Sequence, residues 1–464
     1  MSKRQVFMEY LIQKALSGID ADYAEIRIER AEMTELSYMG PELEIVGTTM
    51  MLGGCVRICQ KGGWGFASFT ALDDLETSAQ RALELARLIS GSGTVIAPVK
   101  PVVATVEWQA PAGACTGTDP STIPLAEKCG LLRSYNEKLL AAEGIVTTRS
   151  RYRDTRCITL IASNEGTNIR REDVHAGVSL MAVARDGANV QRGIKSFGDQ
   201  RGYETVQNHD EEIEGIIKTT RDLMQAPKVK SGVHTVIANP LLAGVFAHEA
   251  FGHLSEADFV YENPQAQDMM KLGRRFGPDY LNIIDDGSLT GEMGYTPYDD
   301  EGVKGRRTYL IRDGVLVGRL HSRETAGKMG EQPTGNARAL DTSFRPIVRM
   351  TNTFIDRGDA PFESMIVDIK DGIYACDYIG GMTDLERFTF SSAYAYRIEN
   401  GAITTPIRDV ILSGNVFETL GNISMIGNDL DIHGGLGGCG KGGQSPLPTS
   451  VGSPHIRIEN VLVG

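Results

Sequence analysis

Two histidines and a glutamate lie close together in the segment ANPLLAGVFAHEAFGHLSEAD, residues 238–258. Imidazole nitrogens bind divalent metals, and a carboxylate beside them can act as a general base toward an activated water. In the common metal-binding motif H-E-x-x-H, the two histidines are four residues apart and lie on one face of a helix. Here His248 and His253 are five residues apart, and Glu249 follows the first of them. The residue types indicate metal chemistry, but the spacing needs an explanation.

The spacing predicts a break in the helix that carries the histidines. Five residues advance a regular α-helix by about 500°, which leaves the two side chains about 140° apart around its axis. A π-bulge with its i to i+5 repeat would bring them nearly into line. Alternatively, the helix could end at Gly252 and free His253 to turn inward. Upstream, residues 233–238 predict a buried strand, Asn239 can cap the helix, and Pro240 suits its first position.

A catalytic zinc site typically has three protein ligands and one open position, so a third ligand is required. Glu256 and Asp258 follow shortly after the histidines. Near the C-terminus, Cys439 lies beside His433 in the glycine-dense segment NDLDIHGGLGGCGKGGQS, where a cysteine is poorly explained by packing. The residues alone leave a second interpretation open, in which hydrogen-bonded core histidines pair with a buried Glu249.

The pattern of the whole chain predicts a mixed α+β fold. Period-two alternation over residues 23–69 and 145–193 indicates antiparallel strands, and helical periodicity marks segments near 1–18, 73–91, 121–142 and 210–225. The helix 73–91 has an aspartate at its predicted N-cap, and residues 92–120 read as a long surface connection. We predict an N-terminal α+β domain over residues 1–227 and a β-rich, barrel- or sandwich-like domain over residues 228–464, which carries the histidine helix.

Composition excludes several classes of partner. The formal net charge of −13 argues against nucleic acid, because phosphate binding needs a basic face. There is no run of 18 apolar residues, so we expect no membrane span. The N-terminal segment reads as an amphipathic helix and not as a signal peptide, which predicts a cytoplasmic protein. Seven scattered cysteines in a chain of 464 residues argue against a disulfide framework.

The segment HEAFGHLSEAD resembles the H-E-x-x-x-H signature of the TldD/PmbA family of metallopeptidases, in its metal-bearing TldD type. The similarity extends to YDDEGVKGRRTYLIRDGVLVG, PTGNARALDTSFRPIVRMTNTFI, DGIYACDYIGG and the C-terminal block that includes CGKGGQ, all in the family's order. It covers nearly the whole chain and is strongest from residue 233 onward.

The resemblance implies one zinc per chain, bound by His248, His253 and Cys439, with Glu249 as the catalytic glutamate. His433 is then a competing ligand or a local neighbour. The implied activity is hydrolysis of unfolded or flexible peptides in a cleft that excludes folded proteins. The implied assembly has two subunits, either with the metal-free TldE/PmbA-type homologue or as a homodimer.

The sequence alone leaves other functions and other metals open. The chain could be a zinc-containing binding or regulatory protein of the gyrase-modulator type, or another metal-dependent amide hydrolase. Two histidines and a cysteine could also hold iron, cobalt or nickel. Substrate-binding residues are unknown. Candidates for stabilising the oxyanion, each more often structural, are Arg338, Arg349, Tyr394 and Tyr396. Asn336 or Asn352 could contact the backbone of a peptide substrate.

Overall fold

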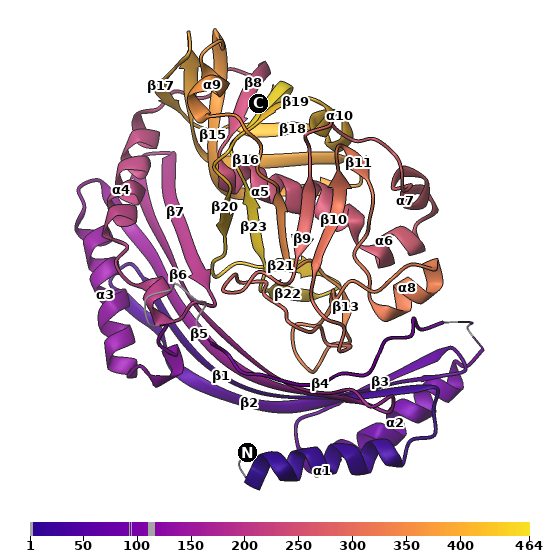
Figure 1. Ribbon diagram of the computed structural model, residues 1–464. Helices are drawn as coiled ribbons and strands as arrows, with labels where there is room; N and C mark the ends of the chain where they lie inside the picture. The colour runs from indigo at the N-terminus through magenta and orange to yellow at the C-terminus, as the bar shows by residue number, and fades with distance from the viewer. Residues whose placement is uncertain (1–2, 92, 94, 110–116) are drawn as a thin grey trace.

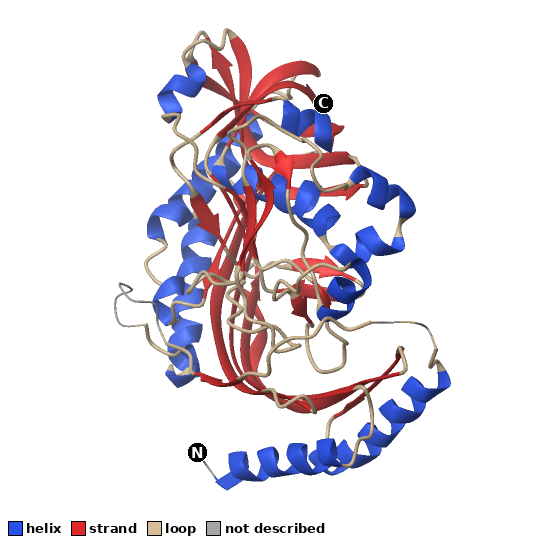
Figure 2. Cartoon of the chain, turned by 45° about the vertical axis from the view of Figure 1, so that its right-hand side comes forward, coloured by secondary structure: helices blue, strands red, loops and turns tan. Residues whose placement is uncertain are grey.

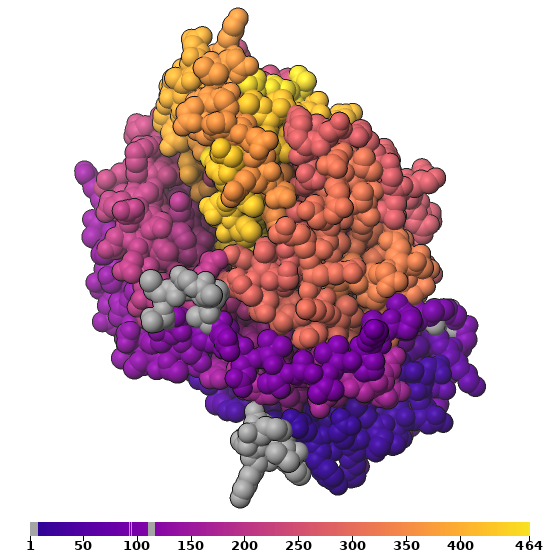
Figure 3. All heavy atoms as spheres, viewed as in Figure 1, coloured from indigo at the N-terminus to yellow at the C-terminus, as the bar shows by residue number. Residues whose placement is uncertain are grey.

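The computed structural model describes residues 3–91, 93, 95–109 and 117–464 (Figure 1). Parts of the predicted connection 92–120, namely residues 92, 94 and 110–116, lie outside the described residues. The first seven strands form one large curved sheet, and the remaining strands form a second body on its concave side (Figures 1 and 2). In the space-filling view, this C-terminal body is seated against the N-terminal part (Figure 3).

The N-terminal sheet has the strand order β3-β2-β1-β5-β6-β4, and β7 also pairs with β6. Its strands are β1 (Tyr23–Met39), β2 (Glu42–Gln60), β3 (Gly63–Phe69), β4 (Val103–Val106), β5 (Ile145–Ser163), β6 (Asn168–Asp186) and β7 (Asn189–Asp199). The predicted antiparallel strands are confirmed. The predicted connection 92–120 was wrong in one respect, because it contains β4, which pairs in parallel with β6 from Val103↔Asn168 onward.

Four helices cover the convex face of this sheet (Figures 1 and 2). They are α1 (Lys3–Ser17), α2 (Leu75–Leu88), α3 (Leu125–Ala141) and α4 (Asp210–Gln225). Helices α1 and α2 bury apolar side chains against β1 to β3. Helices α3 and α4 do so against the C-terminal end of β1 and the middle of β5 and β6. Asp74 occupies the N-cap of α2 as predicted, but its side chain makes no capping bond, because a 3₁₀ turn over Leu72–Asp74 precedes the helix.

The C-terminal part contains a closed barrel of five strands. The barrel order is β15-β8-β24-β18-β16, and pairing of β15 with β16 closes it. Its strands are β8 (Gly232–Ala238), β15 (Asp371–Asp384), β16 (Arg387–Glu399), β18 (Ile411–Asn415) and β24 (Ile456–Val463), with β17 (Ala402–Ile407) and β19 (Ile423–Ile426) added at its edges. The predicted α+β class with a β-rich, barrel-bearing C-terminal half is confirmed.

A second C-terminal sheet has the order β11-β10-β9-β14-β23-β20. It consists of β9 (Ile283–Asp286), β10 (Arg307–Arg312), β11 (Val315–Leu316), β14 (Asn352–Ile355), β20 (Asp431–His433) and β23 (Ser450–Ser453). Two further pairs of short strands form separate two-stranded sheets. They are β12 (Ala337–Arg338) with β13 (Ile347–Val348), and β21 (Cys439–Lys441) with β22 (Gln444–Leu447). The C-terminal part also contains short helices, which are α6 (Ala257–Glu262), α7 (Pro264–Met269), α8 (Arg323–Met329), α9 (Phe362–Ile366) and α10 (Val416–Gly421).

Helix α5 (Pro240–Ala247) packs between the barrel and the second sheet, where it is buried in the largest apolar core. Its Phe246 ring makes edge contacts with Phe388 and Phe390 of the barrel. The predicted domain boundary at residue 227 falls between α4 and β8 and stays a prediction. In the described part of the chain, no helix is both long and apolar enough to cross a membrane.

Candidate metal centre

The helix that carries the histidines changes its winding where the sequence predicted a break. Asn239 caps α5 by accepting a hydrogen bond from the Leu242 amide, and Pro240 is its first residue. The α-helix ends at Ala247 and continues as a π-helical turn over His248–Gly252. A π turn has the i to i+5 repeat that the two histidines require. The first of the two predicted devices is therefore confirmed.

Glycine is required at position 252 because the packing around its Cα leaves no room for a side chain. A Cβ added at Gly252 would lie 2.2 Å from Met350 Sδ, far inside van der Waals contact. Its backbone is right-handed, with φ of −57°, so the glycine is required by close packing and not by an unusual dihedral angle. The chain then passes through a 3₁₀ turn, His253–Ser255, into α6. This sequence of turns aims both imidazoles at one point.

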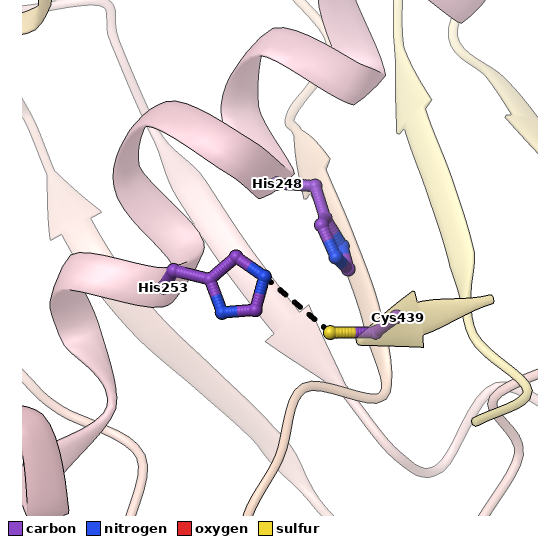
Figure 4. Close-up of side chains that lie close together, drawn as sticks. All are labelled: His248, His253 and Cys439. Atoms are coloured by element: carbon purple, nitrogen blue, oxygen red, sulfur yellow. Dashed lines mark hydrogen bonds between the residues drawn. The ribbon is translucent and has the colours of Figure 1, made fainter. Parts of the chain in front are cut away.

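Three side chains meet at that point (Figure 4). One ligand-type atom each from His248, His253 and Cys439 lies within 4.8 Å of the others. His253 Nε2 is 3.4 Å from Cys439 Sγ. Tetrahedral zinc with nitrogen and sulfur ligands separates such atoms by about 3.5 Å, given Zn–N and Zn–S bonds of roughly 2.0 and 2.3 Å. The spacing of this pair therefore matches the spacing of two ligands around one zinc ion.

Cys439 reaches the histidines from the hairpin β21–β22. In this hairpin Cys439 pairs with Leu447 and Lys441 with Gln444. The turn needs the glycines at 442 and 443, which have positive φ angles of 58° and 79°. Arg349, which is fully buried, donates a hydrogen bond of 2.7 Å to the carbonyl oxygen of Cys439. The glycine-rich segment is thus a fixed support for the thiol.

A buried carboxylate orients one of the two imidazoles. Glu256, 1% exposed, lies with Oε2 2.9 Å from His253 Nδ1 and 3.1 Å from Lys441 Nζ. Lys441 also donates to Asp258 Oδ1 at 2.6 Å and to the Val348 carbonyl at 2.9 Å. A carboxylate on one ring nitrogen directs the other ring nitrogen toward the metal position. Sequence reasoning weighed Glu256 and Asp258 only as ligands, and neither belongs to the group of three.

The charges around the thiol favour its ionised form. Burial acts to raise the pKa of Cys439, but hydrogen bonds from His248 and His253 outweigh it and lower the pKa to about 5. Burial acts to lower the pKa of His253, and the Glu256 carboxylate overcomes this effect and raises it well above its ordinary value. A thiolate is the form of cysteine that binds metal ions. The electrostatics therefore suit a cation at this point.

The donor set fits zinc. It consists of two imidazoles and one thiolate, which is the number of protein ligands in a catalytic zinc site. His248 is 3% exposed, and its Nδ1 is buried with no hydrogen-bond partner among the described residues. An imidazole buried without full use of its nitrogens is costly unless a further group binds there. These three residues are therefore suited to hold the ion between them.

Glu249 lies beside the three residues but is not one of them. Its side chain is 32% exposed, and Oε2 is 3.9 Å from His253 Nε2. The alternative reading of Glu249 as a buried ion partner of core histidines does not agree with this exposure. The charge of Glu249 also acts on Tyr378 of β15, whose pKa is raised by burial and further by this charge. The carboxylate thus faces both the candidate metal position and solvent.

Other residues singled out in the sequence lie apart from the three. His433 is in β20, with Nε2 3.4 Å from Asp431 Oδ2, and does not belong to the ligand group. Its predicted place as a local neighbour suits this position. Tyr394 and Tyr396 are on barrel strand β16, where Tyr396 stacks against Tyr374. The structure gives none of these side chains a direct contact with the thiol of Cys439.

The polar candidates for substrate contacts are engaged in holding loops together. Arg338 donates to the carbonyl oxygens of Met350 and Pro448 at 2.6 and 2.8 Å. Asn336 donates to Asp285 and to the Arg349 carbonyl, and Asn352 donates to the Asp286 carbonyl. All of these hydrogen bonds are buried or partly buried. These side chains therefore have a structural use, which for Arg338 agrees with the prediction.

A cavity of about 310 Å³ lies between the concave face of the N-terminal sheet and the C-terminal loops. Its lining includes Glu29, Met51 and Arg171 from the sheet and Leu436 and Leu447 from the loops. The three candidate ligands do not line it. The cavity reaches the hairpin of Cys439 from the side of its partner strand, because Leu447 pairs with Cys439.

Two imidazoles and a thiol with an adjacent carboxylate are a donor set of the kind found in metal-dependent hydrolases, and comparisons with known proteins identify the class. The sequence matches the PmbA/TldA metallopeptidase C-terminal domain over residues 231–464, the central domain over residues 118–225, and domain 1 over residues 24–86. The chain belongs to the PmbA/TldD family of metallopeptidases.

Relatives carry names that agree with this class. A protein of Synechocystis sp. named as a metalloprotease is 44% identical over 445 residues, which cover 96% of this chain and 95% of the relative. A protein of Saccharolobus solfataricus named as a zinc metalloprotease and TldD homologue is 34% identical over 306 residues, covering 65% and 68%. A crystal structure from Thermotoga maritima, described as a candidate modulator of a DNA gyrase, has the same fold, with a TM-score of 0.78, 21% identity and full coverage of both chains.

Proposed function

We propose that this chain is a zinc-dependent peptidase, with one zinc ion bound by His248, His253 and Cys439 and with Glu249 as its general base. The observation that carries the proposal is the convergence of two imidazoles and a thiol, with a partly exposed carboxylate 3.9 Å from one ligand nitrogen. The names of the relatives support both the metal and the reaction class.

When bound, zinc supplies Lewis-acid chemistry: it polarises a carbonyl oxygen and makes a water molecule acidic near neutral pH. Glu249 accepts a proton from the attacking water and delivers it to the nitrogen of the leaving amine. Water adds to the carbonyl carbon, the C–N bond breaks, and the products are a carboxylic acid and an amine. Glu256 holds His253 in the tautomer that keeps its Nε2 toward the metal position.

The proposed substrates are unfolded or flexible peptides that enter a secluded cleft. This agrees with the burial of the candidate ligands, since His248 and Cys439 are each 3% exposed. We expect an extended chain to reach groups at that depth more readily than a folded protein does, because it needs only a narrow path. The proposed setting is the cytoplasm. The proposed assembly contains two subunits, either two copies of this chain or this chain with a metal-free homologue of the TldE/PmbA type.

The first test is the zinc content of the purified chain, measured by elemental analysis after zinc addition and dialysis. Wild type should retain about one zinc per chain, and Cys439→Ser should lose most of it. Cys157→Ser is a matched control, because Cys157 is a free cysteine outside the ligand group. Wild type that retains no zinc, alone or with an added homologue, would contradict the proposed centre.

The second test separates an enzyme from a binding protein. Glu249→Gln should keep its zinc and lose peptidase turnover by at least about 100-fold, the scale of a general base. A zinc-containing regulatory protein would be unaffected in partner binding and would show no turnover to lose. Profiling of peptide, amide and ester substrates then distinguishes a peptidase from another metal-dependent hydrolase.

A further inference from the structure

Arg338 is a buried cation without an acidic partner. It is 9% exposed, and its Nη1 and Nη2 atoms donate to the carbonyl oxygens of Met350 and Pro448 at 2.6 and 2.8 Å. Within the described residues, no carboxylate oxygen lies within 4.0 Å of its guanidinium nitrogens. Carbonyl oxygens accept hydrogen bonds but do not neutralise a charge, and a charge removed from water is unfavourable unless an opposite charge compensates it. The surroundings of Arg338 therefore suit a negatively charged group.

A second buried arginine adds to this local positive charge. Arg349 is fully buried and donates to the Cys439 carbonyl, while its Nε and Nη1 atoms have no hydrogen-bond partner among the described residues. Burial, and after it the charge of Arg349, lower the pKa of Arg338 to about 10. The charges of Asp300 and Asp285 act in the opposite direction, but neither carboxylate is within ion-pair distance of Arg338. The positive charge in this region is thus only partly compensated.

Arg338 lines the cavity of about 310 Å³ between the N-terminal sheet and the C-terminal loops. The other arginines of this lining have acidic partners. Arg171 Nε lies 2.7 Å from Asp173 Oδ2, and Arg153 Nη2 lies 3.0 Å from Glu35 Oε1. Among the described arginines of the lining, Arg338 alone has no carboxylate partner. The uncompensated charge therefore lies where there is room for a ligand.

Apolar side chains line both walls of this cavity. Met33 and Met51 contribute from the sheet, and Leu340, Leu436 and Leu447 from the C-terminal loops. Methionine side chains adapt to ligands of different shapes. Small-molecule sites typically combine apolar walls with a few polar groups in a volume of about 300–1,000 Å³, and this cavity is at the lower end of that range. A ligand that fits it is small and has an apolar part.

The acids of the lining do not occupy the place of such a ligand. Asp173 and Asp300 are both bonded to Arg171, at 2.7 and 3.3 Å. Burial raises the pKa of Glu29 to about 7, so this carboxyl group is partly neutral near physiological pH. An anion beside Arg338 therefore meets little repulsion from these side chains.

We propose that this cavity binds an organic carboxylate, with the carboxylate group on Arg338 and the apolar part against the methionine and leucine side chains. Guanidinium presents five N–H donors in a planar fork that matches a carboxylate, and Arg338 uses only some of them on carbonyl oxygens. Such a carboxylate is carried by a free organic acid and by the C-terminal residue of a peptide. Leu447 lines the cavity and pairs with Cys439, so the cavity and the candidate metal centre share one hairpin. The inference concerns binding alone and does not depend on the proposed peptidase chemistry.

Isothermal titration calorimetry of the full chain with N-acetyl-leucine gives the first test. This probe has one carboxylate and one apolar side chain, and N-acetyl-leucine amide is the matched neutral probe. The acid should bind, and the amide should bind about 10–100-fold more weakly, because it lacks the charge-assisted hydrogen bonds to Arg338. Zinc is removed from the chain beforehand, so that a carboxylate bound to zinc does not contribute.

Charge variants on the sheet wall test the location without changing Arg338. Met51 lines the cavity and is 49% exposed. Met51→Glu should weaken the binding of N-acetyl-leucine and Met51→Lys should strengthen it, each by about two- to fivefold, the scale of one partly exposed charge. Met50→Glu should bind like wild type, because Met50 is 60% exposed and does not line the cavity. Arg338→Gln, with its folding checked by circular dichroism, should lose the preference for the acid over the amide.

A peptide that ends in leucine distinguishes the two sources of the carboxylate. N-acetyl-Ala-Ala-Ala-Leu is titrated into Glu249→Gln, with and without zinc, so that the proposed turnover does not interfere. Zinc should strengthen binding if the carboxylate belongs to a peptide that also reaches the metal centre. If the ligand is a free acid, zinc should have no effect and the peptide should bind no more tightly than N-acetyl-leucine. The inference holds in both cases.

Three results would overturn the inference. Equal binding of the acid and the amide, or binding of neither, would show that the cavity holds no carboxylate. An unchanged preference for the acid in folded Arg338→Gln would exclude Arg338 as its partner. Equal affinities of Met51→Glu, Met51→Lys and Met50→Glu would place the bound carboxylate outside this cavity.

Discussion

His253 Nδ1 lies 2.9 Å from Glu256 Oε2, while its Nε2 lies 3.4 Å from Cys439 Sγ. One ring nitrogen is therefore held by a buried carboxylate, and the other faces the thiol. Glu256 can remain ionised at 1% exposure because Lys441 lies 3.1 Å from the same oxygen. The orientation of the imidazole thus depends on a pair of charges that do not belong to the ligand group.

Glu256→Gln should weaken zinc binding by about 10–100-fold, the usual effect of losing such a support. Glutamine can still accept the hydrogen bond from Nδ1, but it has no charge to fix the tautomer or to balance Lys441. Competition with a chromophoric chelator measures the affinity. Asp258→Asn is the control, since Asp258 bonds to Lys441 but not to either histidine. Equal zinc affinities of wild type and Glu256→Gln would refute this role for Glu256.

Metal removal should lower the stability of the folded chain. Zinc that binds only the native state stabilises it by about 2.7 kcal/mol when its free concentration is 100 times Kd. Differential scanning calorimetry with and without a chelator should therefore show a lower Tm after zinc is removed. In Cys439→Ser the two Tm values should coincide. A chelator effect of equal size in that variant would place the stabilising metal elsewhere.

Gly252→Ala should damage both stability and metal binding. The added methyl group would lie 2.2 Å from Met350 Sδ, so either Met350 or the π turn must shift. Overpacking of this kind costs about 1–3 kcal/mol, measured by urea unfolding. Gly215→Ala in α4 is the control, because a Cβ there meets nothing within 4 Å and alanine favours a helix. Unchanged stability and zinc affinity in Gly252→Ala would show that the close packing is not required.

The break in the helix that carries the histidines could be predicted from the sequence. Five-residue spacing of the histidines is incompatible with a shared target on a regular helix, so a local break near Gly252 was predictable. Long alternating strands and periodic helices were predictable for the same local reason. Strand β4 was not, because its four residues, VATV, sit in a proline-rich connection, and it forms only through pairing with β6. Assembly of the barrel likewise depends on long-range pairing, here of β8 with β15 and with β24.

The candidate site also contains some residues that could be predicted from the sequence and others that could not. The residue types and their spacing identify His248, His253 and Glu249 as candidates in the sequence. The glycine-rich segment around Cys439 identifies this cysteine in the same way. The role of Glu256 was missed because sequence proximity to the histidines suggested a ligand, whereas its contacts are with His253 Nδ1 and Lys441. Lys441 is more distant still, 183 residues beyond Asp258 in the chain, and the folded hairpin β21–β22 brings it there. A charged pair of this kind carries no local sequence signal.

Glu29 should make the chain less stable as the pH rises from about 4.5 to about 7. It lines the cavity near Arg27, with Oε1 3.4 Å from Nε. Burial raises its pKa from an ordinary value of 4.5 to about 7, against the opposing charge of Arg27. The folded state then binds more protons than the unfolded state between these two values. The contribution of Glu29 to stability is therefore fully present below about pH 4.5 and is lost by about pH 7.

Glu29→Gln should remove that loss, because glutamine has a similar shape and cannot ionise. We expect the variant to be more stable than wild type at pH 8 by on the order of 2–3 kcal/mol, and to differ little from it at pH 4.5. Urea unfolding over this pH range measures the difference, with Glu32→Gln on the same strand as the control. Arg27 keeps Asp300 as a buried partner in the variant, so no cation is left unpaired. A difference between wild type and Glu29→Gln that stays constant from pH 4.5 to 8 would mean that Glu29 does not titrate in this window.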